Sequence, residues 1–337
     1  MANNNFKPFA AAAGANVMAQ ADYEALAALL TGFQSGTAQS AQLNKVWRQS
    51  SIMAAVLGQF IVDLTGQDAV DDGTTATLLA NLKMAVQAQS AAVVGQVRNL
   101  RMSVTTASNT ATLNADEIVV GTALGGQKYL LKQFSKTINL AAAGAGGMDT
   151  GTSPVSTWVA IYLIYNPSTG ASALLGYNTG SNVAPEVYGG ANMPAGYTAS
   201  ALVSIVATNP SGQLKPFIQM DRKVAFAGIG VFNSTTDASS FQPISLIGVV
   251  PPNAKTAGGY GDVSVTVGGV TNFAFASDAT GIGNQTFNSS SESAYGHSLV
   301  WTDIPLAVQQ TIYIYRAATL NGSGTRQYTA YCSSYTF

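Results

Sequence analysis

Hydrophobic and polar positions follow two different periods along the chain. Up to about residue 100, apolar residues recur at helical spacing, and no proline lies between Phe9 and Ser153. Beyond that point, short runs rich in Val, Thr, Tyr and Ile alternate with Gly, Asn and Pro, which is typical of strands and turns. The sequence therefore predicts an α+β multidomain protein. We expect a helical region over residues 1–100, a first β domain over residues 101–232 and a C-terminal β domain over residues 233–337, with sandwich or jelly-roll-like β domains.

Three helices are predicted in the front part. The first covers residues 20–30 and stops at Gly32, and the second covers residues 40–64. The third begins near Thr75, where Asp71, Asp72 and Thr74 are candidate caps. The second helix is apolar almost all round over residues 52–62. Because such a helix must be covered on more than one side, we expect it to dock onto a partner or to pack against copies of itself.

The third helix carries a seven-residue repeat. Position a of this repeat holds four apolar residues: Leu79, Val86, Val93 and Leu100. Position d holds Leu82, Gln89 and Gln96, and polar core layers of this kind fix register and oligomer number. Two interpretations stay open: a short trimeric coiled coil with Leu79, Leu82, Val86, Gln89, Val93 and Gln96 in its core, or one amphipathic helix folded against its predecessors.

The first fifteen residues are small and polar apart from Phe6 and Phe9. A terminus of this composition is usually disordered until it binds something. The two aromatic residues, together with Trp47 of the second helix, are candidates for anchoring a partner protein. The alternative is a frayed tail without a function.

Runs of β-type residues predict the strands. In the first β domain we expect strands at residues 117–122, 128–134, 158–165, 173–177, 200–208 and 214–221, and in the second at residues 244–250, 263–267, 272–276, 298–302, 311–317 and 327–335. Residues 166–170 and 209–212 read as hairpin loops, and the Gly268-Gly269 pair as a tight hairpin. The glycine-rich residues 258–261 read as a flexible loop, because no lysine or helix follows to complete a phosphate-binding loop.

Charge and cysteine content narrow the functional classes. Charged residues are 9% of the chain, against about 25% in a typical soluble domain. Because few surface charges oppose association between protein molecules, we expect an obligate oligomer. The net charge of −1 gives no basic face for nucleic acid, and the single cysteine, Cys332, allows no intrachain disulfide or thiolate metal site. No apolar run reaches the ~18–20 residues that span a bilayer, and no secretory signal is visible. We expect a soluble protein, synthesised in a cytoplasm and without a cofactor.

Enzyme motifs are sparse, and we expect a protein that is not an enzyme. His297 is the only histidine, so a catalytic relay or a histidine metal site would depend on that residue alone. A carboxylate pair for glycoside cleavage needs only two residues, so counting does not exclude a hydrolase. The last domain is rich in Tyr, Asn, Ser and Gly, a composition suited to binding sugars or protein surfaces without charge. The candidate receptor-contact residues are Tyr260, Asn288, Tyr295 and His297.

The stretch over residues 16–86 resembles the N-terminal region of tail fibre proteins of tailed bacteriophages and related prophages. The segments that carry the likeness are Tyr23-Glu24-Ala25-Leu26, residues 32–36, residues 38–56 and residues 71–76. Long matching stretches make this likeness specific, although it covers only about a quarter of the chain. Residues beyond about 100 resemble the β-rich parts of such fibres in texture alone.

The resemblance implies a homotrimeric component of the virion tail. Its N-terminal part would join a phage tail or baseplate protein, and its C-terminal part would bind a bacterial surface glycan or protein. The chain has no extended shaft of repeats, in which it departs from many long fibres. Two alternatives stay open: a structural baseplate or fibre-anchoring protein that never contacts the host, and a depolymerase that cuts the glycan it binds.

Overall fold

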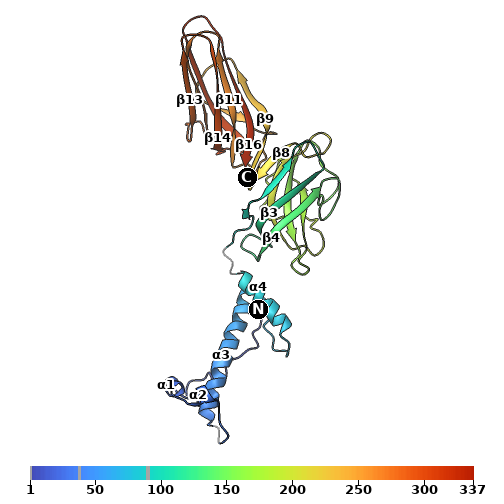
Figure 1. Ribbon diagram of the computed structural model, residues 1–337, viewed down its shortest axis with the longest axis vertical. Helices are drawn as coiled ribbons and strands as arrows, with labels where there is room; N and C mark the ends of the chain where they lie inside the picture. Colours follow the sequence, from blue (N-terminus) through green and yellow to red (C-terminus); the bar gives the residue numbers. More distant parts are fainter. Residues whose placement is uncertain (1, 37–38, 89–91) are drawn as a thin grey trace. The chain divides into compact units, whose positions relative to one another are not determined.

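The computed structural model describes residues 2–36, 39–88 and 92–337 (Figure 1). The chain forms two compact units, Met1–Ala91 with Gly126–Lys128, and Ala92–Gly125 with Tyr129–Phe337. Helices occupy the first unit and antiparallel strands the second, which confirms the predicted fold class. Within the described ranges, no helix combines the length and the apolar character needed to cross a membrane.

The helical unit contains four helices. They are α1 (Gln20–Glu24), α2 (Ala28–Thr31), α3 (Ser40–Thr65) and α4 (Ala76–Ala88). The start and end of α3 match the prediction, and Gly66 ends the helix with a left-handed φ of 67°. The predicted helix over residues 20–30 is wrong in detail, because the chain leaves helical hydrogen bonding between α1 and α2.

The N-terminal segment packs along α3, so the frayed-tail interpretation is wrong. Asn3 and Asn5 exchange backbone hydrogen bonds with Ala69, beyond the end of α3. The Asn4 side chain donates to the Ala55 carbonyl and lies against Gly58, where a Cβ would come within 2.4 Å of the Asn4 oxygen. Because Gly58 has no side chain, it leaves room for the N-terminal segment to pack against α3.

Residues 92–221 form the first β region of the second unit. Its strands are β1 (Val97–Arg98), β2 (Arg101–Val104), β3 (Thr110–Gly121), β4 (Lys128–Asn139), β5 (Trp158–Tyr165), β6 (Ser172–Asn178), β7 (Ala199–Ala207) and β8 (Phe217–Met220). They run in the order β8-β2-β3-β7-β5-β6, with β1 and β4 also paired to β3. The predicted loop at residues 166–170 is confirmed as the β5–β6 hairpin, where the Asn166 side chain accepts the Ser168 and Thr169 amides.

The remaining strands form a jelly roll. They are β9 (Lys223–Ser234), β10 (Ala238–Ser245), β11 (Thr256–Val265), β12 (Gly269–Ala276), β13 (Gln285–Ser291), β14 (Tyr295–Pro305), β15 (Thr311–Leu320) and β16 (Arg326–Thr336). One sheet has the order β14-β11-β16-β9 and the facing sheet the order β10-β15-β12-β13. This alternation between two four-stranded sheets is the double Greek-key order of jelly rolls, one of the two architectures expected.

Two glycine predictions in this region are wrong. Gly268 and Gly269 do not close a hairpin, because β11 and β12 belong to opposite sheets. Residues 258–261 are not a loop but lie in β11, at a bulge opposite β16. A Cβ on Gly259 would fall 1.9 Å from the Tyr331 carbonyl oxygen, so close approach of the backbone explains that glycine.

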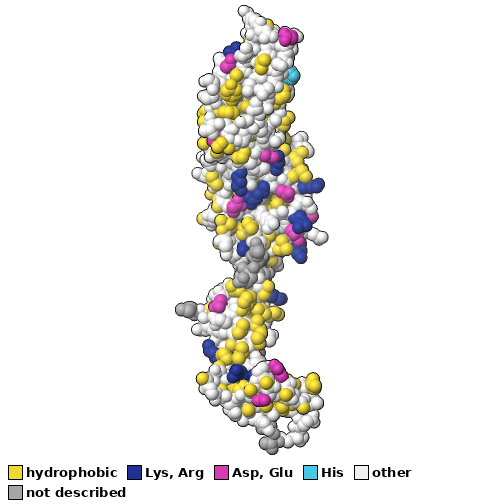
Figure 2. Space-filling view, turned by 90° about the vertical axis from the view of Figure 1, so that its left-hand side faces the viewer, with side chains coloured by type: hydrophobic (Ala, Val, Ile, Leu, Met, Phe, Trp, Pro, Cys, Tyr) yellow, Lys and Arg dark blue, Asp and Glu magenta, His cyan; other side chains and the backbone are white. Residues whose placement is uncertain are grey.

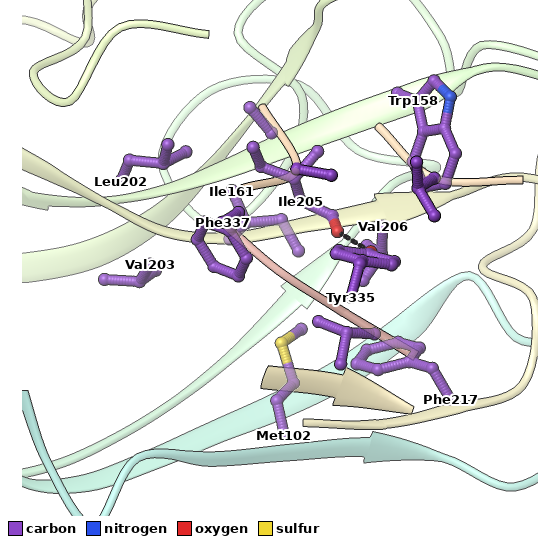
Figure 3. Close-up of a cluster of buried hydrophobic side chains, with 14 of the residues drawn as sticks. Met102, Trp158, Ile161, Leu202, Val203, Ile205, Val206, Phe217, Tyr335 and Phe337 are labelled. Atoms are coloured by element: carbon purple, nitrogen blue, oxygen red, sulfur yellow. Dashed lines mark hydrogen bonds between the residues drawn. The ribbon is translucent and has the colours of Figure 1, made fainter. Parts of the chain in front are cut away.

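The β8–β9 hairpin joins the two β regions into one hydrogen-bonded sheet, through a turn with Asp221 at φ 49°. Beyond this hairpin, the end of β16 inserts Tyr335 and Phe337 among Met102, Ile161, Leu202 and other buried side chains of the first β region (Figure 3). The Tyr335 hydroxyl donates to the Ile205 carbonyl, the dashed line in Figure 3. The two β regions therefore share one core.

Candidate functional sites

The helical unit exposes a continuous apolar face on α3. Counting from Leu43, position a of a seven-residue repeat holds Leu43, Ser50, Leu57 and Leu64, and position d holds Val46, Met53 and Phe60. Met53 is 59% exposed and Leu57 46%, and Val56 beside them is exposed as well. Figure 2 shows hydrophobic side chains gathered along this unit. Such a seam is the packing surface of a coiled coil. Its two ends are half-buried within the unit, at Leu43, Val46, Phe60 and Leu64, and its centre at Met53 and Leu57 is exposed.

This unit has few buried side chains of its own. Among its described residues, the buried hydrophobic ones are Tyr23, Ile61, Ala69 and Ala85. The buried Lys45 lies with its ammonium 5.8 Å from the Tyr23 ring centre, and no large aliphatic cluster surrounds the pair. The described part of this unit therefore has only a small hydrophobic core of its own.

The predicted trimer core falls only partly on a helix. Leu79, Leu82 and Val86 lie on α4, with Leu79 and Val86 exposed. The coiled-coil register beyond α4 is wrong, because Val93 and Gln96 lie outside any helix and Leu100 is buried in the β unit; Gln89 is outside the described residues. The backbone carbonyl of Gln96 instead accepts a hydrogen bond from the backbone amide of Val119 on β3. The seven-residue repeat that stays on one helix is that of α3.

Two of the three predicted attachment residues lie together. The rings of Phe9 and Trp47 meet edge to face with centroids 5.7 Å apart, and the Phe9 amide donates to the Ser51 hydroxyl on the same helix. Both rings are about half exposed, and Phe6 is half-buried earlier in the same segment. The contact forms an aromatic knob on the side of α3.

The outer face of the jelly roll's β14-β11-β16-β9 sheet carries a stacked pair of tyrosines. Tyr260 on β11 and Tyr331 on β16 have ring centroids 4.8 Å apart and nearly parallel planes. Tyr331 lies against Gly230, and the Tyr260 hydroxyl lies over Gly228, where a Cβ would be 2.6 Å away. The two glycines of β9 thus let the rings lie low across the sheet.

Polar side chains continue this face beside the tyrosine pair. Asp262, two residues beyond Tyr260, accepts hydrogen bonds from Ser298 at 2.5 Å and from Thr329 at 3.4 Å. Val300, opposite Tyr260 on β14, is exposed. Aromatic faces next to hydroxyl and carboxylate groups match the alternating apolar and polar faces of a sugar ring.

The other predicted contact residues do not join this face. Tyr295 and His297 lie on β14 with ring centroids 5.1 Å apart, and the Tyr295 hydroxyl is bonded to groups on β12 and β13. His297 pairs with Val263 and reaches Phe287, on the side facing the second sheet. His297 therefore lies within β14, although the strand predicted from the sequence began at residue 298. Asn288 lies exposed on β13 of that second sheet.

The described residues contain no group of three or more His, Cys, Asp or Glu side chains arranged to hold a metal ion. Asp237, in the connection between β9 and β10, joins a small cluster of polar groups, in which it accepts the Tyr328 hydroxyl at 2.9 Å and pairs with Arg326. Burial, and then the hydrogen bond to Asp237, raise the pKa of Tyr328 above its usual range. Tyr328 is fully buried in the sandwich, so this cluster holds the fold together.

No family model matches the chain, and no curated protein matches it. Solved structures that match the chain include two insecticidal crystal proteins of Bacillus thuringiensis, Cry7Ca1 and Cry8Ea1. Cry7Ca1 is 9% identical over 75% of this chain and 54% of its own, with a TM-score of 0.17. Cry8Ea1 is 11% identical over 76% and 55%, with a TM-score of 0.16. The chain spans about half the length of these proteins, and TM-scores this low support no inference about fold or function.

Proposed function

We propose that this protein is a homotrimeric tail fibre component of a tailed bacteriophage, which attaches the virion to the host cell surface. One observation carries the proposal: a helical unit with few buried side chains and exposed apolar residues on α3 precedes a jelly roll with an exposed aromatic face. The first has the character of an assembly module and the second of a recognition module. The resemblance of residues 16–86 to phage tail fibres supports this division of labour.

In the proposed assembly, the α3 helices of three copies run parallel and bury their a and d residues together. The number three comes from the resemblance, whereas the helical seam itself comes from the positions of Met53, Leu57 and their neighbours. The Phe9–Trp47 knob, on the outside of such a bundle, is the candidate contact with the tail or baseplate.

In the proposed recognition module, Tyr260 and Tyr331 stack against a surface glycan of the bacterium. Lectin domains are among the known uses of jelly rolls, and the Asp262 carboxylate beside the rings can accept sugar hydroxyls. A protein receptor would use the same exposed face.

The test is binding of the purified protein to host cells and to their extracted polysaccharide. We expect the double substitution Tyr260→Ala and Tyr331→Ala to weaken binding about a hundredfold or more, since losing aromatic contact area removes about 1.5–3 kcal/mol per buried ring. Tyr313→Ala, on the opposite sheet, is the matched control. Equal binding by the double variant and the wild type would exclude this face as the attachment site.

The purified protein, host cells and extracted polysaccharide also distinguish this proposal from a structural baseplate role and from a depolymerase. A protein that assembles into tails but never binds cells would support the structural baseplate role. Shortened polysaccharide chains after incubation with the protein would support the depolymerase, whereas unchanged chains would remove it.

A further inference from the structure

Two cavities adjoin each other where the first β region meets the jelly roll. The first has a volume of about 230 Å³ and the second about 280 Å³. Four residues line both: Trp158, Ala207, Lys215 and Gly248. The two therefore form one cleft, and junctions between domains are a preferred place for ligand sites. Neither the tyrosine face nor α3 takes part in it.

The first cavity is apolar. Its walls come from β7, β8, β9 and the end of β16, and the side chains inside include Val206, Phe217, Val224, Phe226, Val249 and Tyr335. An engineered cavity of about 150 Å³ with such walls stays dry and binds benzene. The space here is larger, so an aromatic ring or a short aliphatic chain fits.

The second cavity combines apolar walls with polar groups. Ser156, Ser181 and Lys215 line it as exposed residues, and within the described part of the chain their hydroxyls and ammonium make no hydrogen bond or ion pair. Two of its lining residues, Ser156 and Gln310, hold φ angles of 49° and 51°, a conformation uncommon outside glycine. Bonds from the Lys215 amide to Ala207 and from the Gln310 side chain to Val250 fix the surrounding backbone.

We propose that this cleft binds a small amphipathic carboxylate, a ligand that the attachment function does not require. The apolar body enters the first cavity beside Phe217 and Phe226, and the carboxylate meets the Lys215 ammonium and the two serine hydroxyls in the second. Lys215 lines both cavities, so its aliphatic stem can contact the apolar body of the ligand while its ammonium meets the carboxylate.

The test is calorimetric titration of the full-length protein with octanoate and, as a neutral probe of the same length, with 1-octanol. We expect saturable binding of one octanoate per chain. Lys215→Gln should weaken octanoate about tenfold, the loss of one charge-assisted hydrogen bond, and leave octanol unchanged. Lys136→Gln, an exposed charge on β4, should change neither.

A second substitution checks the apolar part. Ala227→Phe, at an exposed position of β9 that lines the first cavity, should abolish binding of both probes. If it lowers the unfolding temperature, Ile229→Trp closes the same cavity from its exposed rim. Absence of saturable octanoate binding overturns the proposal, and so does an affinity that neither Lys215→Gln nor closure of the cavity alters.

Discussion

The exposed seam of α3 makes the sharpest prediction, because a single chain leaves two of its central side chains, Met53 and Leu57, about half exposed. Complete burial of such a side chain contributes about 2 kcal/mol of stabilising free energy. Burying the exposed half of each side chain in a helical bundle should therefore contribute about 1 kcal/mol per residue to the free energy of association. Replacing both by alanine would cost about 2 kcal/mol per chain and about 6 kcal/mol per trimer. The trimer dissociation constant should then rise about 10⁴-fold.

Analytical ultracentrifugation over a range of protein concentrations measures this change. The matched control is Gln59→Ala, an exposed position on a different side of the same helix, which should leave the association unchanged. A wild-type protein that sediments as a monomer at micromolar concentration would refute the reasoning, as would equal effects of the control and the double variant.

Contacts between the β units could hold the trimer together when α3 is altered, so a direct measurement of proximity is also needed. Cys332 is buried, and burial raises the pKa of its thiol to about 12. The native thiol is therefore unreactive, and any interchain disulfide formed comes from the introduced cysteine. Leu57→Cys should form an interchain disulfide under oxidation, because position a faces its equivalents in a parallel bundle. Gln59→Cys should not.

Three further predictions concern the β unit. Tyr335→Phe removes a buried donor to the Ile205 carbonyl and should lower the free energy of unfolding in urea by about 1–3 kcal/mol; an unchanged midpoint would mean that the β regions do not share this contact. Burial raises the pKa values of Tyr162 and Tyr328, so the folded state keeps their protons longer than the unfolded state does. The stability they contribute is present below the usual tyrosine pKa and should fall as pH rises above about 10, which thermal unfolding between pH 7 and 11 would show or refute. Cys332 should resist a disulfide reagent at pH 8 until urea unfolds the protein, and fast labelling of the native protein would contradict its burial.

The sequence alone correctly predicted elements whose hydrogen bonds form within one segment or between neighbouring segments. The ends of α3 follow from its apolar run and Gly66, and the β5–β6 hairpin follows from the turn residues after Asn166. The heptad repeat placed on residues 79–100 is wrong, because Leu100 is drawn into the β core and the helix ends earlier. A repeat of apolar residues does not reveal whether its partner is a helix or a sheet.

Pairing between distant strands could not be read from the sequence. β9, in which Val, Ile and Phe residues are interspersed with Gly and Ala, pairs with β16 far along the chain. β13 is built mainly of polar residues and pairs with the preceding strand β12, although its composition is not that expected of a strand. The tyrosine face illustrates the same limit. Tyr260 was a candidate from its aromatic character, but its partner Tyr331 and the glycines beneath both rings become neighbours only when β9, β16 and β11 pair.

The continuous sheet through the β8–β9 hairpin has a mechanical consequence. A pull on the jelly roll does not stretch a flexible linker, because β9 is held by β8 on one side and β16 on the other. Tyr335 and Phe337 reinforce this junction by sitting in the neighbouring core. A load on the outermost strands therefore passes into the first β region through backbone hydrogen bonds, and the two regions resist it as a single stiff rod.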